Sequence, residues 1–78
     1  MKPRIERTFL SRRIREKLRS RGIEPYHINQ AIRNREVFRR ARYGAYAAIG
    51  RDESGRRLLV VFHLRGATAH VATARQVT

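Results

Sequence analysis

The chain has 78 residues, no cysteine, and 19 lysine and arginine residues against 6 aspartate and glutamate residues, which gives a formal net charge of +13. This length supports one small hydrophobic core, so a single domain spanning residues 1–78 is expected. The absence of cysteine excludes a disulfide-stapled fold and thiolate metal sites. The sequence lacks an apolar run of membrane-spanning length and a signal-peptide pattern, which predicts a cytoplasmic protein without a membrane role.

The positive charge is concentrated in the first half of the chain. Residues 1–42 carry 14 basic and 4 acidic side chains, whereas residues 43–78 carry 5 and 2. Arginine far outnumbers lysine, and its planar guanidinium suits bidentate contact with phosphate. This composition indicates a nucleic acid or an acidic protein as the partner.

The N-terminal part is predicted to contain a basic lead-in, residues 1–7, followed by an amphipathic helix from about Thr8 to Arg21. Ile14 and Leu18 recur on one apolar stripe of that helix, and Gly22 is suited to end it. The basic face of the helix is expected either to contact RNA phosphates or to dock an acidic protein segment.

A second helix is predicted to begin at Pro25 and to end near Asn34, because proline is favoured at the first helical position. Ile28, Ala31 and Ile32 form its apolar stripe. Val37 and Phe38 then begin a short strand, and this strand leads into a cluster of arginines.

The stretch Tyr43–Arg75 is typical of three antiparallel strands joined by two tight turns. The first turn is predicted at Asp52–Gly55 and the second at Arg65–Thr68. Gly55 and Gly66 supply the positive φ angle that such turns require.

The turns set the expected register of the strands. Closing the first turn places Arg51 opposite Arg56, and closing the second places His63 opposite His70. One face of the sheet is then apolar, and consists of Tyr43, Ala45, Ala47, Ile49, Leu58, Val60, Phe62, Leu64 and Val71. The other face is predicted to carry Tyr46, Ala48, Arg57, Leu59, Val61, His63, His70, Ala72 and Ala74. The expected fold is therefore α+β, with two N-terminal helices packed on one face of a three- to four-stranded antiparallel sheet.

Three segments of the chain carry a resemblance to a known family. The segments Arg21–Ile23, Gly50–Phe62 and Val71–Arg75, together with Tyr46, resemble BrnT-type toxins, which are small bacterial ribonucleases with a RelE-like fold made alongside a DNA-binding antitoxin. The likeness extends from about Ile14 to Thr78. It implies the toxin of a type II toxin–antitoxin system, a metal-independent endoribonuclease. The implied partners are RNA, free or held on the ribosome, and a cognate antitoxin; a homodimer is left open.

The sequence also departs from this family. His70 stands where BrnT-like sequences usually carry arginine, and Thr73 stands where they usually carry serine. Those sequences continue into a further helix, whereas this one ends at Thr78. A non-catalytic module that binds nucleic acid or an antitoxin is therefore the alternative prediction, and a protein-interaction domain completed by a partner or a second copy is another.

RNA cleavage of the implied kind uses the 2′-hydroxyl to attack the adjacent phosphate, and so requires a base, an acid and cations. The candidate catalytic residues are His63, His70, Arg57 and Tyr46, which are expected to share one face of the sheet. His63 and His70 are assigned to proton transfer, because cross-strand neighbours place their Cβ atoms ~5 Å apart. Histidines on an open sheet face are also often ordinary solvated residues.

Further arginines are assigned to RNA binding. They are Arg51, Arg65, Arg75, Arg12, Arg13, Arg40 and Arg42. Arg75 has the parity of the apolar face of its strand, so it is expected at the sheet edge. No cofactor is expected, and no metal site, because a third protein ligand beside the two histidines is not evident.

Overall fold

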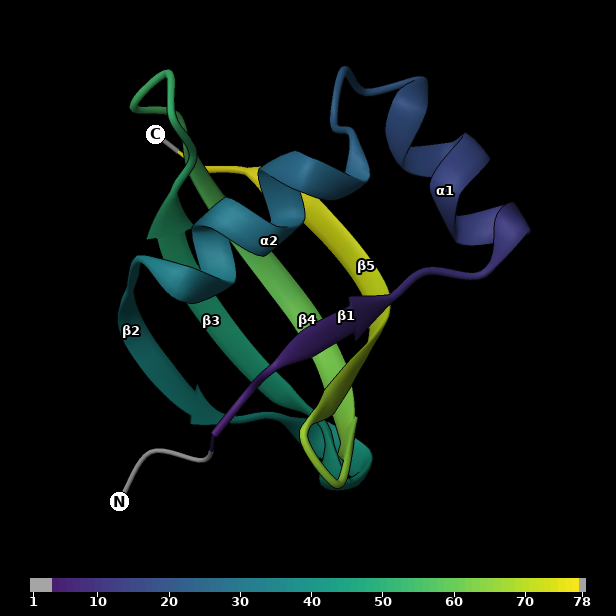
Figure 1. Cartoon of the computed structure of the whole chain (residues 1–78), viewed down its shortest axis with the longest axis vertical. Coiled ribbons are helices and arrows are strands. Elements are labelled where there is room, and N and C mark those ends of the chain that lie inside the picture. The colour runs from purple at the N-terminus through teal and green to yellow at the C-terminus, as the bar shows by residue number, and fades with distance from the viewer. Residues whose placement is uncertain (1–3, 78) are drawn as a thin grey trace.

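The computed structural model describes residues 4–77 as two helices and one five-stranded sheet (Figure 1). The elements follow in the order β1 (Arg7–Phe9), α1 (Arg12–Arg19), α2 (Pro25–Arg33), β2 (Arg35–Arg40), the 3₁₀ turn η1 (Arg42–Gly44), β3 (Tyr46–Arg51), β4 (Arg57–Arg65) and β5 (Thr68–Gln76). The strand order in the sheet is β1-β5-β4-β3-β2. The predicted α+β class and two helices are confirmed, but the sheet has more strands than expected.

The additional strand is β1, which pairs in parallel with β5 and makes the sheet mixed rather than purely antiparallel. Of the predicted basic lead-in, residues 1–3 lie outside the described residues, and Arg7 already belongs to this strand. The helix predicted from Thr8 begins four residues later, because the Ser11 hydroxyl accepts a hydrogen bond from the Ile14 amide and caps the first turn. Thr8 instead joins β1 to the second helix through a hydrogen bond with Asn29.

Both helices contribute to one apolar core (Figure 1). The prediction for α2 is confirmed, with Pro25 as its first residue and Asn34 as its C-cap. The largest fully buried side chains are Phe62, Leu18, Ile23, Ile28, Leu58 and Val60. They belong to α1, α2, the loop between these helices and β4, so the core lies between the helices and one face of the sheet. Neither helix in the described part of the chain is long and apolar enough to cross a membrane.

The α2 helix lies unusually close to β3 at one position. A Cβ atom built on Gly50 would lie 1.9 Å from the carbonyl oxygen of Ala31. Only glycine allows the two backbones to approach this closely. This contact fixes how α2 lies on the sheet.

The register of the β3–β4 hairpin differs by one residue from the prediction. Arg51 pairs with Arg57 rather than with Arg56. Asp52 pairs with Arg56 through an amide-to-carbonyl hydrogen bond of 3.0 Å, so the turn has three residues instead of four. Because side chains alternate along a strand, this shift turns every β3 side chain to the other face.

The shift corrects the predicted faces. Tyr46 and Ala48 lie on the helix-covered face, and Ala47 and Ile49 lie on the opposite one. Tyr43, which was expected in the core, lies in η1 and is 92% exposed.

The β4–β5 hairpin has the predicted turn, and His63 pairs with His70 as expected. The register then shifts between Val61 and Phe62, so that Val61 pairs with Thr73 rather than with Ala72, which a regular continuation of the hairpin would give. Ala72 is the extra, bulged residue. As a result Ala74 is buried and Arg75 lies opposite Leu59, on the face away from the helices, which corrects the parity expected for Arg75.

Candidate functional site

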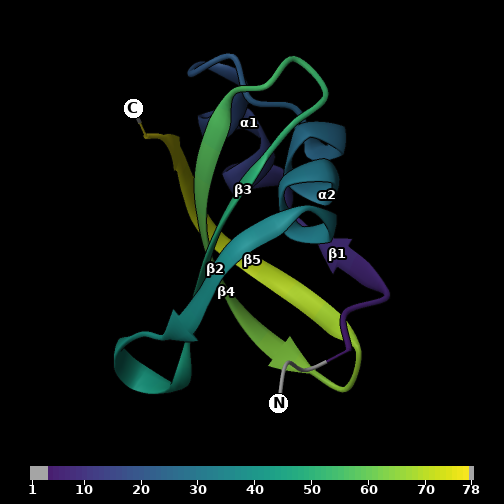
Figure 2. The ribbon, with the colours of Figure 1, turned by 90° about the vertical axis from the view of Figure 1, so that its left-hand side faces the viewer.

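One face of the sheet is not covered by either helix, and we call it the open face. In Figure 2, α2 lies on one side of the strands, and η1 projects to the other side. The strand registers place on this face Val37, Arg39, Ala47, Ile49, Arg51, Arg57, Leu59, Val61, His63, His70, Thr73 and Arg75. A shallow depression of about 280 Å³ lies on it, lined by Val37, Arg39, Ala47, Ile49 and Leu59.

A carboxylate and two arginines meet at one end of the open face, and we call this the Glu36 cluster (Glu36, Arg51, Arg57). The Glu36 carboxylate lies 3.6 Å from Arg51 Nε and 3.7 Å from Arg57 Nε. These separations are longer than good hydrogen bonds, so the three groups form a loose arrangement. Arg75 lies beside the cluster, opposite Leu59 and diagonal to Arg57.

Within this cluster the Nε atom of Arg57 is buried and makes no hydrogen bond to any residue that the structure describes. Buried polar atoms are nearly always hydrogen-bonded, so such an atom calls for an explanation. A guanidinium with an unused donor beside a second guanidinium is suited to receive an anion such as a phosphate.

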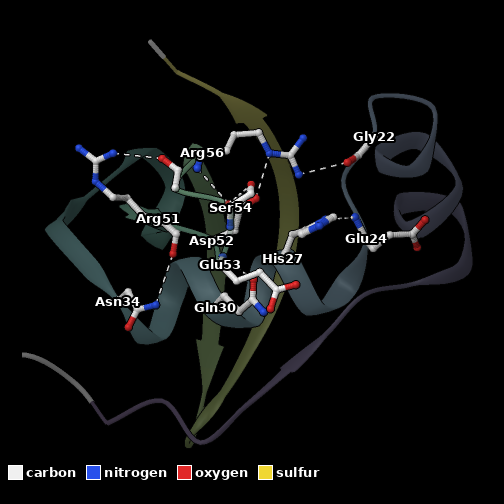
Figure 3. A network of polar contacts seen from close by, with 11 residues as sticks. Gly22, Glu24, His27, Gln30, Asn34, Arg51, Asp52, Glu53, Ser54 and Arg56 are labelled. Atoms are coloured by element: carbon white, nitrogen blue, oxygen red, sulfur yellow. Dashed lines mark hydrogen bonds and ion pairs between the residues drawn. The ribbon is translucent and has the colours of Figure 1, made fainter.

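The tight turn that follows Arg51 is held together by a network of hydrogen bonds (Figure 3). Asp52 Oδ1 accepts hydrogen bonds from the amides of Ser54 and Arg56 and from the Ser54 hydroxyl, and Oδ2 accepts one from Arg56 Nε at 3.0 Å. Burial raises the pKa of Asp52, but these hydrogen bonds outweigh it and lower the pKa from 3.8 to about 2. Asp52 is therefore ionised and fixes the turn that brings Arg51 opposite Arg57.

Other contacts tie this turn to the helical layer (Figure 3). The Glu53 amide donates to Gln30 Oε1 of α2 at 2.9 Å, and Arg56 Nη2 donates to the Gly22 carbonyl at 3.1 Å. At the start of α2, His27 Nδ1 accepts from the Glu24 amide and caps the helix. His27 is thus a helix-capping residue, and the turn beside the Glu36 cluster is held from two sides.

The two predicted catalytic histidines lie at the opposite end of the open face. His63 is exposed, and the half-buried His70 ring lies 5.3 Å from the ring of Phe9 on β1. His63 is six residues from Arg57 along β4, which corresponds to about 20 Å in an extended strand. The structure brings His63 and His70 together as predicted, but it does not bring them to Arg57.

Tyr46 is not part of this face. Its ring stacks on Phe38 at 5.2 Å and lies near Phe62, on the helix-covered side. The prediction that Tyr46 shares a face with Arg57 is therefore wrong, and the cause is the one-residue shift at the Asp52 turn.

The remaining predicted RNA-binding arginines lie in three places. Arg65 ends β4 at the histidine end of the open face, Arg40 ends β2 and Arg42 begins η1, and Arg12 and Arg13 lie at the start of α1. All five are exposed. Arg12 pairs with Glu16 at 3.4 Å, whereas no ion pair joins Arg40 or Arg42 to a carboxylate among residues 4–77.

Sequence reasoning missed Glu36. Its place on the open face follows from the register irregularity between Arg35 and Val37, which a β-strand pattern does not reveal. One available signal was the presence of a single acidic residue between the arginines of this segment.

Over the described part of the chain, histidine and acidic side chains do not gather in groups of three or more that could hold a metal ion.

The fold has a counterpart among solved structures. The chain is similar to the crystal structure of the Brucella abortus ribonuclease toxin BrnT, with a TM-score of 0.73 and 13% sequence identity, over 92% of this chain and 96% of that chain. A likeness at this identity shows a shared fold, so the BrnT-type fold expected from the sequence is confirmed. No family model and no curated relative matches the sequence.

Proposed function

We propose that this protein is a ribonuclease toxin that cleaves RNA at the Glu36 cluster and is neutralised by a cognate antitoxin. The observation that carries the proposal is the meeting of one carboxylate with two paired arginines on an uncovered sheet face. The BrnT-type fold and the net charge of +13 support it.

The cluster contains the base and the cations that this reaction needs. The Glu36 carboxylate accepts the proton of the ribose 2′-hydroxyl as that oxygen attacks the neighbouring phosphorus. Arg51 and Arg57 hold the phosphate and stabilise the additional negative charge of the pentacovalent intermediate. The bond to the 5′-oxygen then breaks, and water at this open site supplies its proton. The products are a 2′,3′-cyclic phosphate and a 5′-hydroxyl, and the 2′-hydroxyl replaces an external nucleophile.

The exposed arginines outside the cluster are proposed to attract and hold the RNA. Arg75 lies closest to the cluster, and the other proposed contacts are Arg12, Arg13, Arg40, Arg42 and Arg65. Such contacts give an affinity that falls steeply as salt rises. The basic face of α1 is equally suited to an acidic segment of an antitoxin, and a partner on the open face would cover the cluster directly.

His63 and His70 remain the sequence-based proposal for proton transfer. Their distance from Arg57 requires that they act on a different phosphate, held by Arg65. We favour the Glu36 cluster because it unites a carboxylate with two guanidinium groups, whereas the described contacts of the histidine pair include only the ring of Phe9.

The reaction itself is tested with purified protein, mixed-sequence single-stranded RNA and excess EDTA, followed by analysis of the product ends. The expected products carry 2′,3′-cyclic phosphate, and the same sequence with 2′-deoxyribose remains intact. Salt-sensitive binding of RNA that is never cut contradicts ribonuclease activity and selects the alternative of a binding module. Cleavage of the deoxyribose substrate contradicts the proposed 2′-hydroxyl chemistry.

A further inference from the structure

Tyr43 occupies an exceptional position in the η1 turn. Its backbone has φ 58° and ψ 38°, and its side chain is 92% exposed. The ring makes no hydrogen bond and no ring contact with any other residue that the structure describes. Bulky residues rarely adopt this left-handed conformation, and an isolated aromatic ring gains nothing from packing when it lies in water.

The fold itself offers no reason for a tyrosine at this position. Gly44 follows with φ 74°, so the turn already contains a residue suited to positive φ. A backbone strained at an exposed aromatic residue is typical of sites that serve binding rather than stability. The feature therefore points to a ligand that the ring contacts.

The surroundings of Tyr43 indicate the chemistry of that ligand. Arg42 directly precedes it in η1 and is exposed, and no carboxylate pairs with Arg42 within residues 4–77. The η1 turn projects to the side of the sheet away from α2, which is the side of the open face (Figure 2). An exposed ring next to an arginine without a carboxylate partner is a combination that suits single-stranded nucleic acid, through base stacking and phosphate contacts.

The open face connects this turn to the Glu36 cluster. The β2 strand runs from the cluster to Arg40, a distance of about 13 Å for four residues of extended chain. Arg39 and the apolar depression lie between the two ends. A strand of RNA held at the cluster therefore needs only a few nucleotides to reach η1.

From these observations we infer that Tyr43, next to Arg42 in the η1 turn, is a stacking platform for one unpaired RNA base a few nucleotides from the phosphate at the Glu36 cluster. The inference rests on the proposed function for the nature of the ligand. It adds the site that holds the RNA outside the reacting phosphate.

The test measures binding of a 2′-O-methyl single-stranded RNA of about ten nucleotides, a length within the range of single-strand binding sites. This RNA cannot be cleaved by its own 2′-oxygen, so affinity is measured without turnover. An abasic oligonucleotide of the same length supplies the backbone charge without bases. Fluorescence anisotropy at fixed salt gives both dissociation constants.

The informative variant is Tyr43→Gly, because it removes the ring and relieves the backbone. We expect its melting temperature to equal or exceed that of the wild type, and its affinity for the base-containing RNA to fall about five- to a hundredfold. Affinity for the abasic oligonucleotide is expected to stay unchanged. Tyr43→Phe, which keeps the ring, retains binding within about twofold of wild type.

Tyr26→Ala is the matched control, since Tyr26 is also exposed but lies on α2, away from the open face. It is expected to bind both oligonucleotides like the wild type. The inference is overturned if Tyr43→Gly binds the base-containing RNA as tightly as the wild type, or if it loses affinity equally for the abasic oligonucleotide. Cleavage is absent from this assay, so these outcomes are separate from the failure of ribonuclease activity, which the EDTA assay detects.

Discussion

Arg51 and Arg57 are paired directly across the β3–β4 hairpin, with both side chains on the open face. The two guanidinium groups carry the same charge and repel each other. The Glu36 carboxylate lies within 3.7 Å of the Nε atom of each arginine. The carboxylate offsets one positive charge and leaves the other. The pair is therefore arranged to hold a phosphate rather than only to close a structural ion pair.

The arginine pair leads to a first prediction, that Arg57→Gln weakens RNA binding about tenfold. The slope of the logarithm of the binding constant against the logarithm of the salt concentration should also become less steep by about 0.7, because one phosphate contact on a single strand contributes this amount. Anisotropy titrations with uncleavable RNA at several salt concentrations measure both quantities. Arg33→Gln is the control, because Arg33 is exposed at the end of α2, on the opposite side of the sheet. An unchanged slope for Arg57→Gln contradicts a phosphate contact at this residue.

The close approach of α2 to β3 gives a second prediction. Gly50→Ala would place a methyl group 1.9 Å from the Ala31 carbonyl oxygen, so the helix must move away from the sheet. We expect a loss of about 3 kcal/mol or more in the free energy of unfolding, measured by urea denaturation. Gly44→Ala is the comparison, because an added Cβ there meets nothing within 4 Å and only the positive φ opposes it. Equal effects of the two substitutions would contradict the close contact.

The Asp52 turn gives a third prediction, on acid stability. The pKa of Asp52 is lowered from 3.8 to about 2 in the fold, so its ionised form stabilises the folded state. This contribution is fully present above about pH 4 and is lost as the pH falls toward 2; we expect it to amount to about 2 kcal/mol. Asp52→Asn should lower stability at pH 7 by a similar amount and flatten the change between pH 4 and 2. An identical acid profile for wild type and Asp52→Asn argues against the assignment.

Much of the fold could be predicted from local patterns. The two glycine turns, the α2 boundaries and the His63–His70 pair all follow from short-range signals, namely turn residues, a proline at the helix start and alternation along the strands. Such signals act within a few residues. They fix where strands end, and the hairpin turn then fixes the register.

The faces of β3 could not be predicted in the same way. Whether Arg51 pairs with Arg56 or Arg57 depends on the hydrogen bonds that Asp52 makes inside the turn, and a change of one residue inverts the strand. For this reason the sequence placed Tyr46 on the open face. Glu36 and Tyr43 were missed because a register irregularity and a left-handed backbone place them, and neither leaves a periodic pattern.

The most direct test of the account is the single-turnover cleavage rate of Glu36→Gln, with RNA in saturating complex with the protein and EDTA present. We expect the rate to fall about 10²- to 10⁴-fold, the usual contribution of a positioned general base, while RNA affinity is kept or increased because a negative charge is removed. Glu16→Gln, an exposed carboxylate paired with Arg12 on α1, is the control and should cleave like the wild type.

The same measurement on His63→Ala and His70→Ala decides between the two ends of the open face. The proposed cleavage at the Glu36 cluster predicts that both histidine variants cleave at nearly the wild-type rate and that Glu36→Gln does not. A wild-type rate for Glu36→Gln, together with loss of cleavage in either histidine variant, would contradict it and place the chemistry at the histidine pair.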